Sequence, residues 1–131
     1  MRRLLRLLVV PLALVACASA ARANGQWTFL GQQAVTDRLD HDAIVVTAAE
    51  GRFDAIQLRV LRAAVDFHTV VVHFRNGGRQ DVELRQTIRA GGSSRRIDLT
   101  GDDRVIQRVE FWYDARTVRG RQATVRLFGD R

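Results

Sequence analysis

Residues 65–88, with the sequence VDFHTVVVHFRNGGRQDVELRQTI, decide the fold of this chain. Two stretches rich in β-branched residues flank Asn76-Gly77-Gly78, a turn typical of a tight β-hairpin because its central residues tolerate positive φ angles. The incoming stretch, 65–74, contains Val70-Val71-Val72 and is apolar on both faces, as in a central strand covered on both sides or a bent sheet. The return stretch, 81–88, is predicted to be the second strand of the hairpin.

The alternation of apolar and polar residues continues on both sides of this hairpin. Residues 54–61 place Ile56, Leu58 and Val60 on one face, which we expect to point inward. The longest predicted strand, 105–113, places Val105, Gln107, Val109, Phe111 and Tyr113 on one face and Ile106, Arg108, Glu110 and Trp112 on the other. Periodicity alone leaves open which of these two faces is buried. In all, we predict strands at 27–30, 43–47, 54–61, 65–74, 81–88, 96–99, 105–113 and 123–128.

About eight antiparallel strands in little more than 100 residues favour two packed sheets, because a single sheet would leave one apolar face in water. The sequence therefore predicts an all-β fold, an antiparallel two-sheet sandwich of jelly-roll type. Residues 24–131 are expected to form this single domain. No helix is predicted, because residues 48–51 are too short to form one.

The N-terminal residues 1–23 have the pattern of a signal peptide. Arg2, Arg3 and Arg6 precede an apolar segment at 7–15, and small residues follow at 16–23. The apolar segment is shorter than the roughly 20 residues that cross a bilayer, so we expect a removable leader. The mature domain is expected to work in the periplasm or as a secreted protein.

Cys17 is the only cysteine in the sequence and lies within this leader. Leu14-Val15-Ala16-Cys17 resembles a bacterial lipobox, in which the thiol is acylated and a lipid anchors the protein to a membrane. Ordinary cleavage after Ala20 or Ala23 is the alternative, and it removes Cys17 with the leader. In neither case does the mature domain contain a disulfide bond.

The charge pattern argues against a nucleic-acid partner. The chain has 21 basic residues, all arginine, and 14 acidic ones, for a formal net charge of +7. Three of these arginines, Arg2, Arg3 and Arg6, begin the leader, and the remaining charges of both signs are interspersed along the chain without a basic block. We expect no nucleic-acid binding.

Three aspartates, Asp37, Asp40 and Asp42, are a candidate calcium site, because clustered carboxylates in a loop are ligands that calcium prefers. The alternative is a structural turn or pairing with arginine, since the segment lacks the glycine and glutamate of an EF-hand loop. His68 and His73 lie five residues apart on one predicted strand and should therefore face opposite sides. No metal or other cofactor is expected beyond this calcium candidate.

A candidate binding surface comprises Arg96, Arg108, Glu110 and Trp112. An aromatic ring can stack on a sugar or peptide, and an arginine can hold an anion. The alternative is cross-strand pairing of arginine with glutamate and packing of Trp112 between the sheets. Ser93 and Ser94 follow two glycines without the G-x-S-x-G context of a nucleophile, which favours a flexible turn.

Several motifs resemble those of a family of small exported bacterial proteins known as a domain of unknown function. They are Trp27 with Leu30-Gly31, Asp37-Arg38 with Asp40, Asp42 and Ile44, Gly51-Arg52-Phe53, Ile97 to Gly101, Arg104-Val105-Ile106, Val109 to Tyr113, and Gly120-Arg121 with Ala123-Thr124-Val125. The resemblance implies a β-rich periplasmic domain and brings no known reaction.

We therefore expect an exported, non-enzymatic binding or interaction module of the bacterial cell envelope. Its partner would be an envelope glycan, an anionic small molecule or an envelope protein, and it would meet a membrane only through a lipid on Cys17. A structural or stress-related envelope protein without a small ligand is the first alternative. A hydrolase is a less favoured one and would need a pocket holding a carboxylate or histidine with a strongly shifted pKa.

Overall fold

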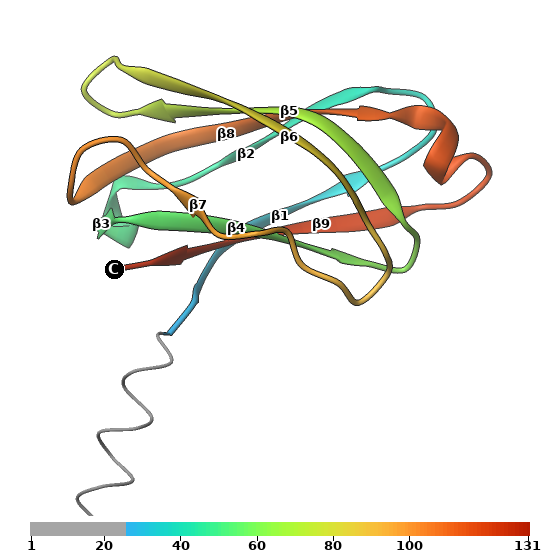
Figure 1. Cartoon of the computed structure of the whole chain (residues 1–131), viewed down its shortest axis with the longest axis horizontal. Helices are drawn as coiled ribbons and strands as arrows, with labels where there is room; N and C mark the ends of the chain where they lie inside the picture. Colours follow the sequence, from blue (N-terminus) through green and yellow to red (C-terminus); the bar gives the residue numbers. More distant parts are fainter. Residues whose placement is uncertain (1–25) are drawn as a thin grey trace, which may run out of the picture.

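The computed structural model describes residues 26–131 and contains two antiparallel sheets packed face to face (Figure 1). The four-stranded sheet has the order β1 (Thr28–Val35), β9 (Ala123–Asp130), β4 (Ala55–Leu61) and β7 (Ile97–Asp98). The five-stranded sheet has the order β2 (His41–Val45), β8 (Arg104–Asp114), β5 (Val65–Phe74) and β6 (Arg79–Ile88), and β3 (Arg52–Phe53) pairs with β8. The predicted all-β two-sheet sandwich is confirmed.

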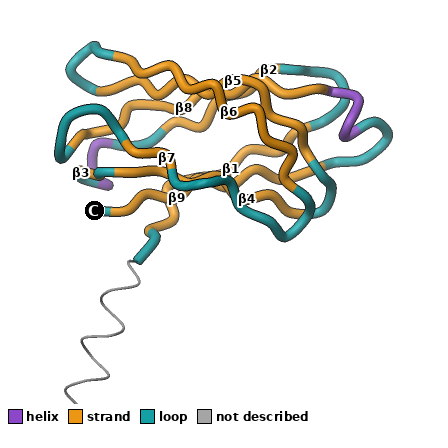
Figure 2. The backbone as a smooth tube through the Cα atoms, in the orientation of Figure 1, coloured by secondary structure: helices purple, strands orange, loops and turns teal. Residues whose placement is uncertain are grey.

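The eight strands other than β3 follow the path of a jelly roll. Along the chain they alternate between the sheets, apart from the β5–β6 hairpin, so the first and last strands pair in one sheet. All eight predicted strands are present, and β3 is additional. Two short 3-10 helices were not predicted, η1 (Ala48–Glu50) and η2 (Ala115–Val118) (Figure 2). A side-chain cap from Asp114, which accepts a hydrogen bond from the Arg116 amide, begins η2.

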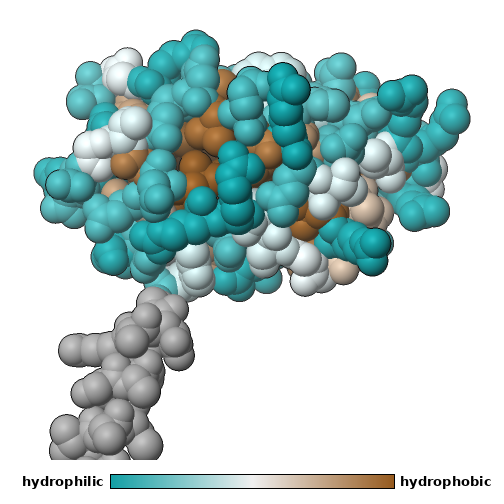
Figure 3. All heavy atoms as spheres, in the orientation of Figure 1, coloured by the Kyte–Doolittle hydropathy of each residue, from teal (hydrophilic) through white to brown (hydrophobic). Residues whose placement is uncertain are grey.

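The core lies between the sheets and is apolar. Ile56, Leu58 and Val60 of β4 are fully buried, as their alternation predicts. From the other sheet, Phe67 and Phe111 meet edge to face with ring centroids 5.8 Å apart. On the face seen in the space-filling view, hydrophobic residues gather in the middle and hydrophilic ones border them (Figure 3). Burial of these side chains is the main source of stability.

The β5–β6 hairpin has the predicted turn. The Phe74 amide donates to the Gly78 carbonyl at 2.9 Å, and the Gly77 amide donates to the Phe74 carbonyl at 3.0 Å. Gly77 has a φ of 96°, which favours glycine at this position. All three of Val70, Val71 and Val72 are buried, as expected for a strand with neighbours on both sides.

Two irregularities in the β5–β8 register change which side chains share a face. Phe67 pairs with Tyr113 and Val70 with Phe111, so β5 has one extra residue in this interval. At the other end of the β5–β8 pair, the extra residue is in β8. Here Phe74 pairs with Ile106, while its neighbour His73 pairs with Arg108. Ile106 is therefore fully buried, as Val109 is. Its predicted position on the same face as Arg108 is wrong, because regular alternation does not hold across a bulge.

Within residues 26–131, no helix is both long and apolar enough to span a membrane.

Gly129 marks a close approach between the sheets and provides a test of the packing. A Cβ atom at this position would lie 2.7 Å from Cδ1 of Phe53 and 3.0 Å from Cδ1 of Leu30. Gly129→Ala should therefore lower the free energy of unfolding by about 1–3 kcal/mol, through overpacking. Urea denaturation measures the change, and an unchanged free energy of unfolding would contradict this description of the core.

Candidate functional site

The outer face of the five-stranded sheet carries a polar network. Val109, Phe111 and Tyr113 of β8 are buried in the core, so Arg108, Glu110 and Trp112 lie on the outer face. This answers the question that periodicity left open. Three of the four predicted binding residues are therefore together on one surface.

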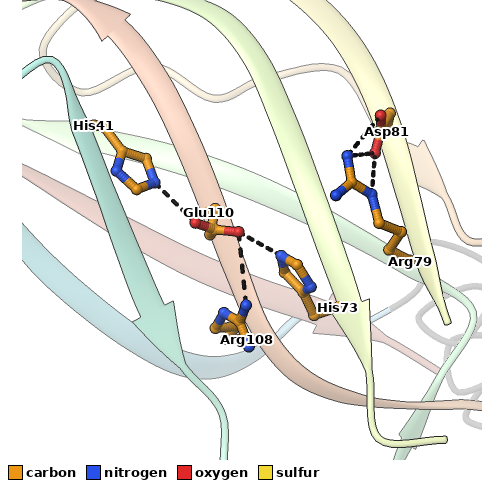
Figure 4. A network of polar contacts seen from close by, with 6 residues as sticks. All are labelled: His41, His73, Arg79, Asp81, Arg108 and Glu110. Atoms are coloured by element: carbon orange, nitrogen blue, oxygen red, sulfur yellow. Dashed lines mark hydrogen bonds and ion pairs between the residues drawn. The ribbon is translucent and has the colours of Figure 1, made fainter. Parts of the chain in front are cut away.

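Glu110 is the centre of the network (Figure 4). Its Oε2 atom lies 2.9 Å from Nε2 of His41 on β2, and its Oε1 atom contacts Nε2 of His73 on β5. Arg108 is 3.9 Å from the same carboxylate. Two histidines from the flanking strands, and not the expected arginine alone, therefore bind the glutamate. These contacts could not be predicted from the sequence, since they depend on strand order and register.

The histidines make Glu110 a stronger acid. Burial by itself would raise the pKa of the Glu110 carboxyl, but hydrogen bonds from His73 and His41 offset it and hold the pKa below its ordinary value of 4.5. The carboxylate is therefore ionised at neutral pH. With its oxygens occupied by two imidazoles, it is poorly placed to bind anything else.

Trp112 lies on the outer face of the sheet and is not packed between the sheets. The His41 ring stacks on it with centroids 4.4 Å apart and an interplanar angle of 21°. This contact covers one side of the indole. The predicted aromatic platform is thus partly occupied by a side chain of the protein itself.

Arg96 lies elsewhere and does not join this surface. Its Nε donates to Asp98 at 2.9 Å and its Nη1 to Asp130 at 2.5 Å, on the four-stranded sheet. Arg96 was predicted to share a surface with the outward residues of β8. The jelly-roll path instead takes β7, the strand that follows Arg96, to the other sheet, next to β4.

His68 and His73 share the outer face, and the prediction that they face opposite sides is wrong. His68 lies close to Asp66 and Asp114, whereas His73 contacts Glu110. Asp114 and Glu110 are both outward residues of β8. The extra residue of β5 between Phe67 and Val70 changes the alternation between the two histidines.

The three candidate calcium ligands do not converge. Asp37 accepts a hydrogen bond from the Gly120 amide at 3.1 Å, and Asp42 accepts one from the Tyr113 hydroxyl at 3.3 Å. The Asp40 carbonyl accepts one from the Tyr113 amide at 3.0 Å. Burial raises the pKa of Asp42, and the Tyr113 hydrogen bond partly opposes this. Asp37 and Asp42 thus have long-range hydrogen-bond partners within the protein, whereas the Asp40 contact is made by its backbone.

Within residues 26–131, the ligand atoms of Asp66, His68 and Asp114 do lie within 4.8 Å of one another. Arg116 already holds Asp114, because its Nε and Nη2 donate to both carboxylate oxygens, at 3.1 and 2.9 Å. These hydrogen bonds lower the pKa of Asp114 to about 2. One of the three possible ligands is thus already paired with an arginine.

Ser94 is buried and is not part of a flexible turn. Its hydroxyl accepts a hydrogen bond from the Leu58 amide at 3.0 Å and donates to the Arg95 carbonyl at 2.8 Å. These hydrogen bonds of Ser94 therefore hold the segment before β7 against β4. Cys17, the candidate lipidation site, lies outside the described residues.

A cleft lined by three arginines was not predicted. It has a volume of about 300 Å³ and lies where β3, the β5–β6 turn and the start of β8 meet, lined by Arg52, Phe74, Arg75, Asn76, Asp103, Arg104 and Val105. The one available sequence signal was an arginine beside each of three turns. Only the fold brings those turns together.

Contacts in the cleft orient two of the three arginines, Arg52 and Arg104, without neutralising them. Nη1 of Arg52 donates to the Asp103 carbonyl at 3.1 Å, and Nη1 of Arg104 donates to the Thr100 carbonyl at 2.5 Å. The Arg104 guanidinium also lies 3.6 Å from the centre of the Phe74 ring. Within residues 26–131, none of the three forms an ion pair with a carboxylate.

Comparison with known proteins gives one family and one structural neighbour. Residues 6–129 match the family model described as Domain of unknown function (DUF2541). No curated protein matches the sequence. A solved structure described as "Structural and functional characterization of Pseudomonas aeruginosa AlgX" is similar, with a TM-score of 0.52 and 13% identity. The alignment covers 76% of this chain and 26% of that one, and at this identity it shows a shared fold alone.

The Glu110 network predicts a pH-dependent contribution to stability. Glu110→Gln should lower the free energy of unfolding at pH 7 by about 1–3 kcal/mol, because both imidazoles lose a charged acceptor. The pKa of Glu110 is lower in the folded chain, so this contribution is present above pH 4.5 and is lost as the pH falls below it. Urea denaturation at pH 7, 5 and 3 should show the two proteins converging at pH 3.

Asp81→Asn is the matched control for this variant. Asp81 pairs with Arg79 on the same face (Figure 4), but both side chains are more than half exposed. Its loss should leave stability unchanged at pH 7. Equal effects of the two substitutions would show that the histidines do not stabilise Glu110.

Proposed function

The chain belongs to the DUF2541 family, and we propose that it is an exported β-sandwich module that binds a small anionic ligand of the bacterial cell envelope. The leader pattern at residues 1–23 supports export. Membership of this family implies no particular reaction or ligand, so the proposal rests on the residues of this chain.

The observation that carries the proposal is the uncompensated charge of the arginine-lined cleft. Three guanidinium groups face one carboxylate, that of Asp103, among the lining residues. Backbone carbonyls accept hydrogen bonds from Arg52 and Arg104 and fix their positions, but leave both positive charges available. A preorganised cationic cleft of this kind attracts an anion more strongly than isolated surface arginines do.

The size of the cleft and the geometry of its donors indicate the ligand class. A volume of about 300 Å³ is at the lower end of small-molecule sites. Guanidinium groups bind carboxylate and phosphate oxygens through pairs of parallel hydrogen bonds. A small carboxylate or a phosphate ester therefore fits better than a neutral sugar.

Two outward acids of β8, which lie outside the cleft, also support a binding role without catalysis. A general base works best with a pKa near the working pH. Glu110 and Asp114 are instead held below their ordinary pKa values by histidine and arginine partners. Neither is suited to accept a proton at neutral pH.

A structural envelope protein without a small ligand is the second candidate. The outer face of the five-stranded sheet favours it, since Glu110, His41 and Trp112 satisfy one another. The two candidates differ in what an added anion does to stability.

Inorganic phosphate should stabilise the domain if the cleft binds anions. At about five times the dissociation constant, the stabilisation is about 1 kcal/mol, or roughly 4–8 °C in Tm. The double variant Arg52→Gln with Arg75→Gln should lose this shift. Thermal unfolding at low ionic strength measures it, with sodium chloride of equal ionic strength as the reference.

Arg85→Gln is the control, because this exposed arginine is paired with Glu83 at 3.1 Å and does not line the cleft. It should retain the phosphate shift. Sulfate, citrate and a neutral sugar complete the panel. If none of the anions raises the Tm, the structural candidate is favoured.

Cell fractionation and intact mass test export. We expect a processed protein outside the cytoplasm, starting at Ala21 or Asn24, or at Cys17 with a lipid mass added. A full-length chain in the cytosol that retains residues 1–23 would contradict the proposal.

A further inference from the structure

The outer face of the four-stranded sheet, the lower layer in Figure 1, carries two parallel rows of side chains that cross the strands. In the aromatic row, Phe128 of β9 pairs with Phe29 of β1 and Gln57 of β4. In the basic row, Arg126 of β9 pairs with Gln32 of β1 and Arg59 of β4. The rows are two residues apart along β9, or about 7 Å.

The charges of the basic row are not balanced by the protein. Arg59 and Arg126 are directly opposite each other, an arrangement that destabilises a sheet. Nε of Arg59 donates to the neutral side chain of Gln57 at 3.0 Å, and Nε of Arg126 is buried without an acceptor. Asp130, further along β9, is paired with Arg96. Within residues 26–131, neither arginine of the row forms an ion pair.

The aromatic row orients these arginines. The Arg59 guanidinium lies 4.0 Å from the centre of the Phe128 ring, and the Arg126 guanidinium lies 4.6 Å from that of Phe29. Stacking uses the flat face of a guanidinium and leaves its N–H groups, which lie in the plane, available to an oxyanion. Phe29 is 42% exposed beside them, so part of its ring is open to a ligand.

We propose that Arg59 and Arg126 bind a carboxylate of an acidic glycan, one of whose sugar rings lies on the exposed side of Phe29. The unneutralised guanidinium pair supplies the complementary charge, and the exposed Gln32 at the end of the basic row supplies an amide for hydroxyl groups. The two rows lie along the outer face of a sheet, which suits an extended saccharide. This site is separate from the arginine-lined cleft, and neither depends on the other.

A lipid surface is a poorer match for the same chemistry. Membrane insertion requires apolar side chains that project well beyond the surface. Phe29 and Leu61 on this sheet are only about 40% exposed, and both belong to strands rather than to protruding loops.

Titration of the full domain with an oligogalacturonate, followed by calorimetry, tests the proposal. Arg59→Gln and Arg126→Gln should each weaken binding by about 10- to 100-fold, the effect of losing a charge-assisted pair of hydrogen bonds. Phe29→Ala should weaken it as well. A neutral dextran should not bind.

Stability measurements separate binding from folding. Arg126→Gln should keep or raise the Tm, because it removes a like-charge contact and an unsatisfied buried donor. If that variant nevertheless unfolds, Arg59→Gln carries the test. Unchanged oligogalacturonate affinity in the folded Arg59→Gln variant would overturn the proposal.

Two controls distinguish this site from the cleft and from a membrane. Arg75→Gln should leave oligogalacturonate affinity unchanged, while Arg126→Gln should leave the phosphate shift of the cleft unchanged. Binding to phosphatidylglycerol vesicles without any binding of oligogalacturonate would also overturn the proposal.

Discussion

The packing of the two sheets against each other through one apolar core determines what every strand of this protein presents to solvent. Phe67, Phe111 and Tyr113 bury their rings on the inner side of the five-stranded sheet, opposite Leu58 and its neighbours. Because successive residues of a strand point to opposite sides, burying one set fixes the other set outside. The described residues contain no cysteine, so this burial, with the hydrogen bonds of the sheets, holds the outer surfaces in place.

The β-bulges modify this rule at the places where the polar network forms. Without the extra residue in β5, His68 and His73 would lie on opposite faces. Without the one in β8, Ile106 would lie outside beside Arg108. At the bulges, buried and outward residues therefore no longer alternate regularly along the strand. The bulge in β5 also places His73 on the same face as Glu110.

The two outer faces of the sandwich differ in how far the protein satisfies its own charges. On the five-stranded sheet, Glu110 is bound by two histidines and Trp112 is covered by one of them. On the four-stranded sheet, Arg59 and Arg126 face each other without a counter-ion. Unbalanced charge on a folded scaffold reduces stability and is retained most readily where a ligand supplies the missing partner. We therefore propose two cationic sites, the arginine-lined cleft and the pair Arg59 and Arg126. The surface of Arg108, Glu110 and Trp112 is better explained as structural.

The fold class and every strand except β3 could be predicted from the sequence. Alternation at 54–61 and the Asn76-Gly77-Gly78 turn are local signals, and local backbone preferences are enough to specify a strand or a hairpin. Tertiary structure alone decided which strands became neighbours, where the bulges lie and which arginines face a carboxylate. Arg96 illustrates the difference, because its strand is next to β8 in sequence but lies in the other sheet. Pairing between distant strands depends on how the whole core is filled, and no short stretch of sequence contains that information.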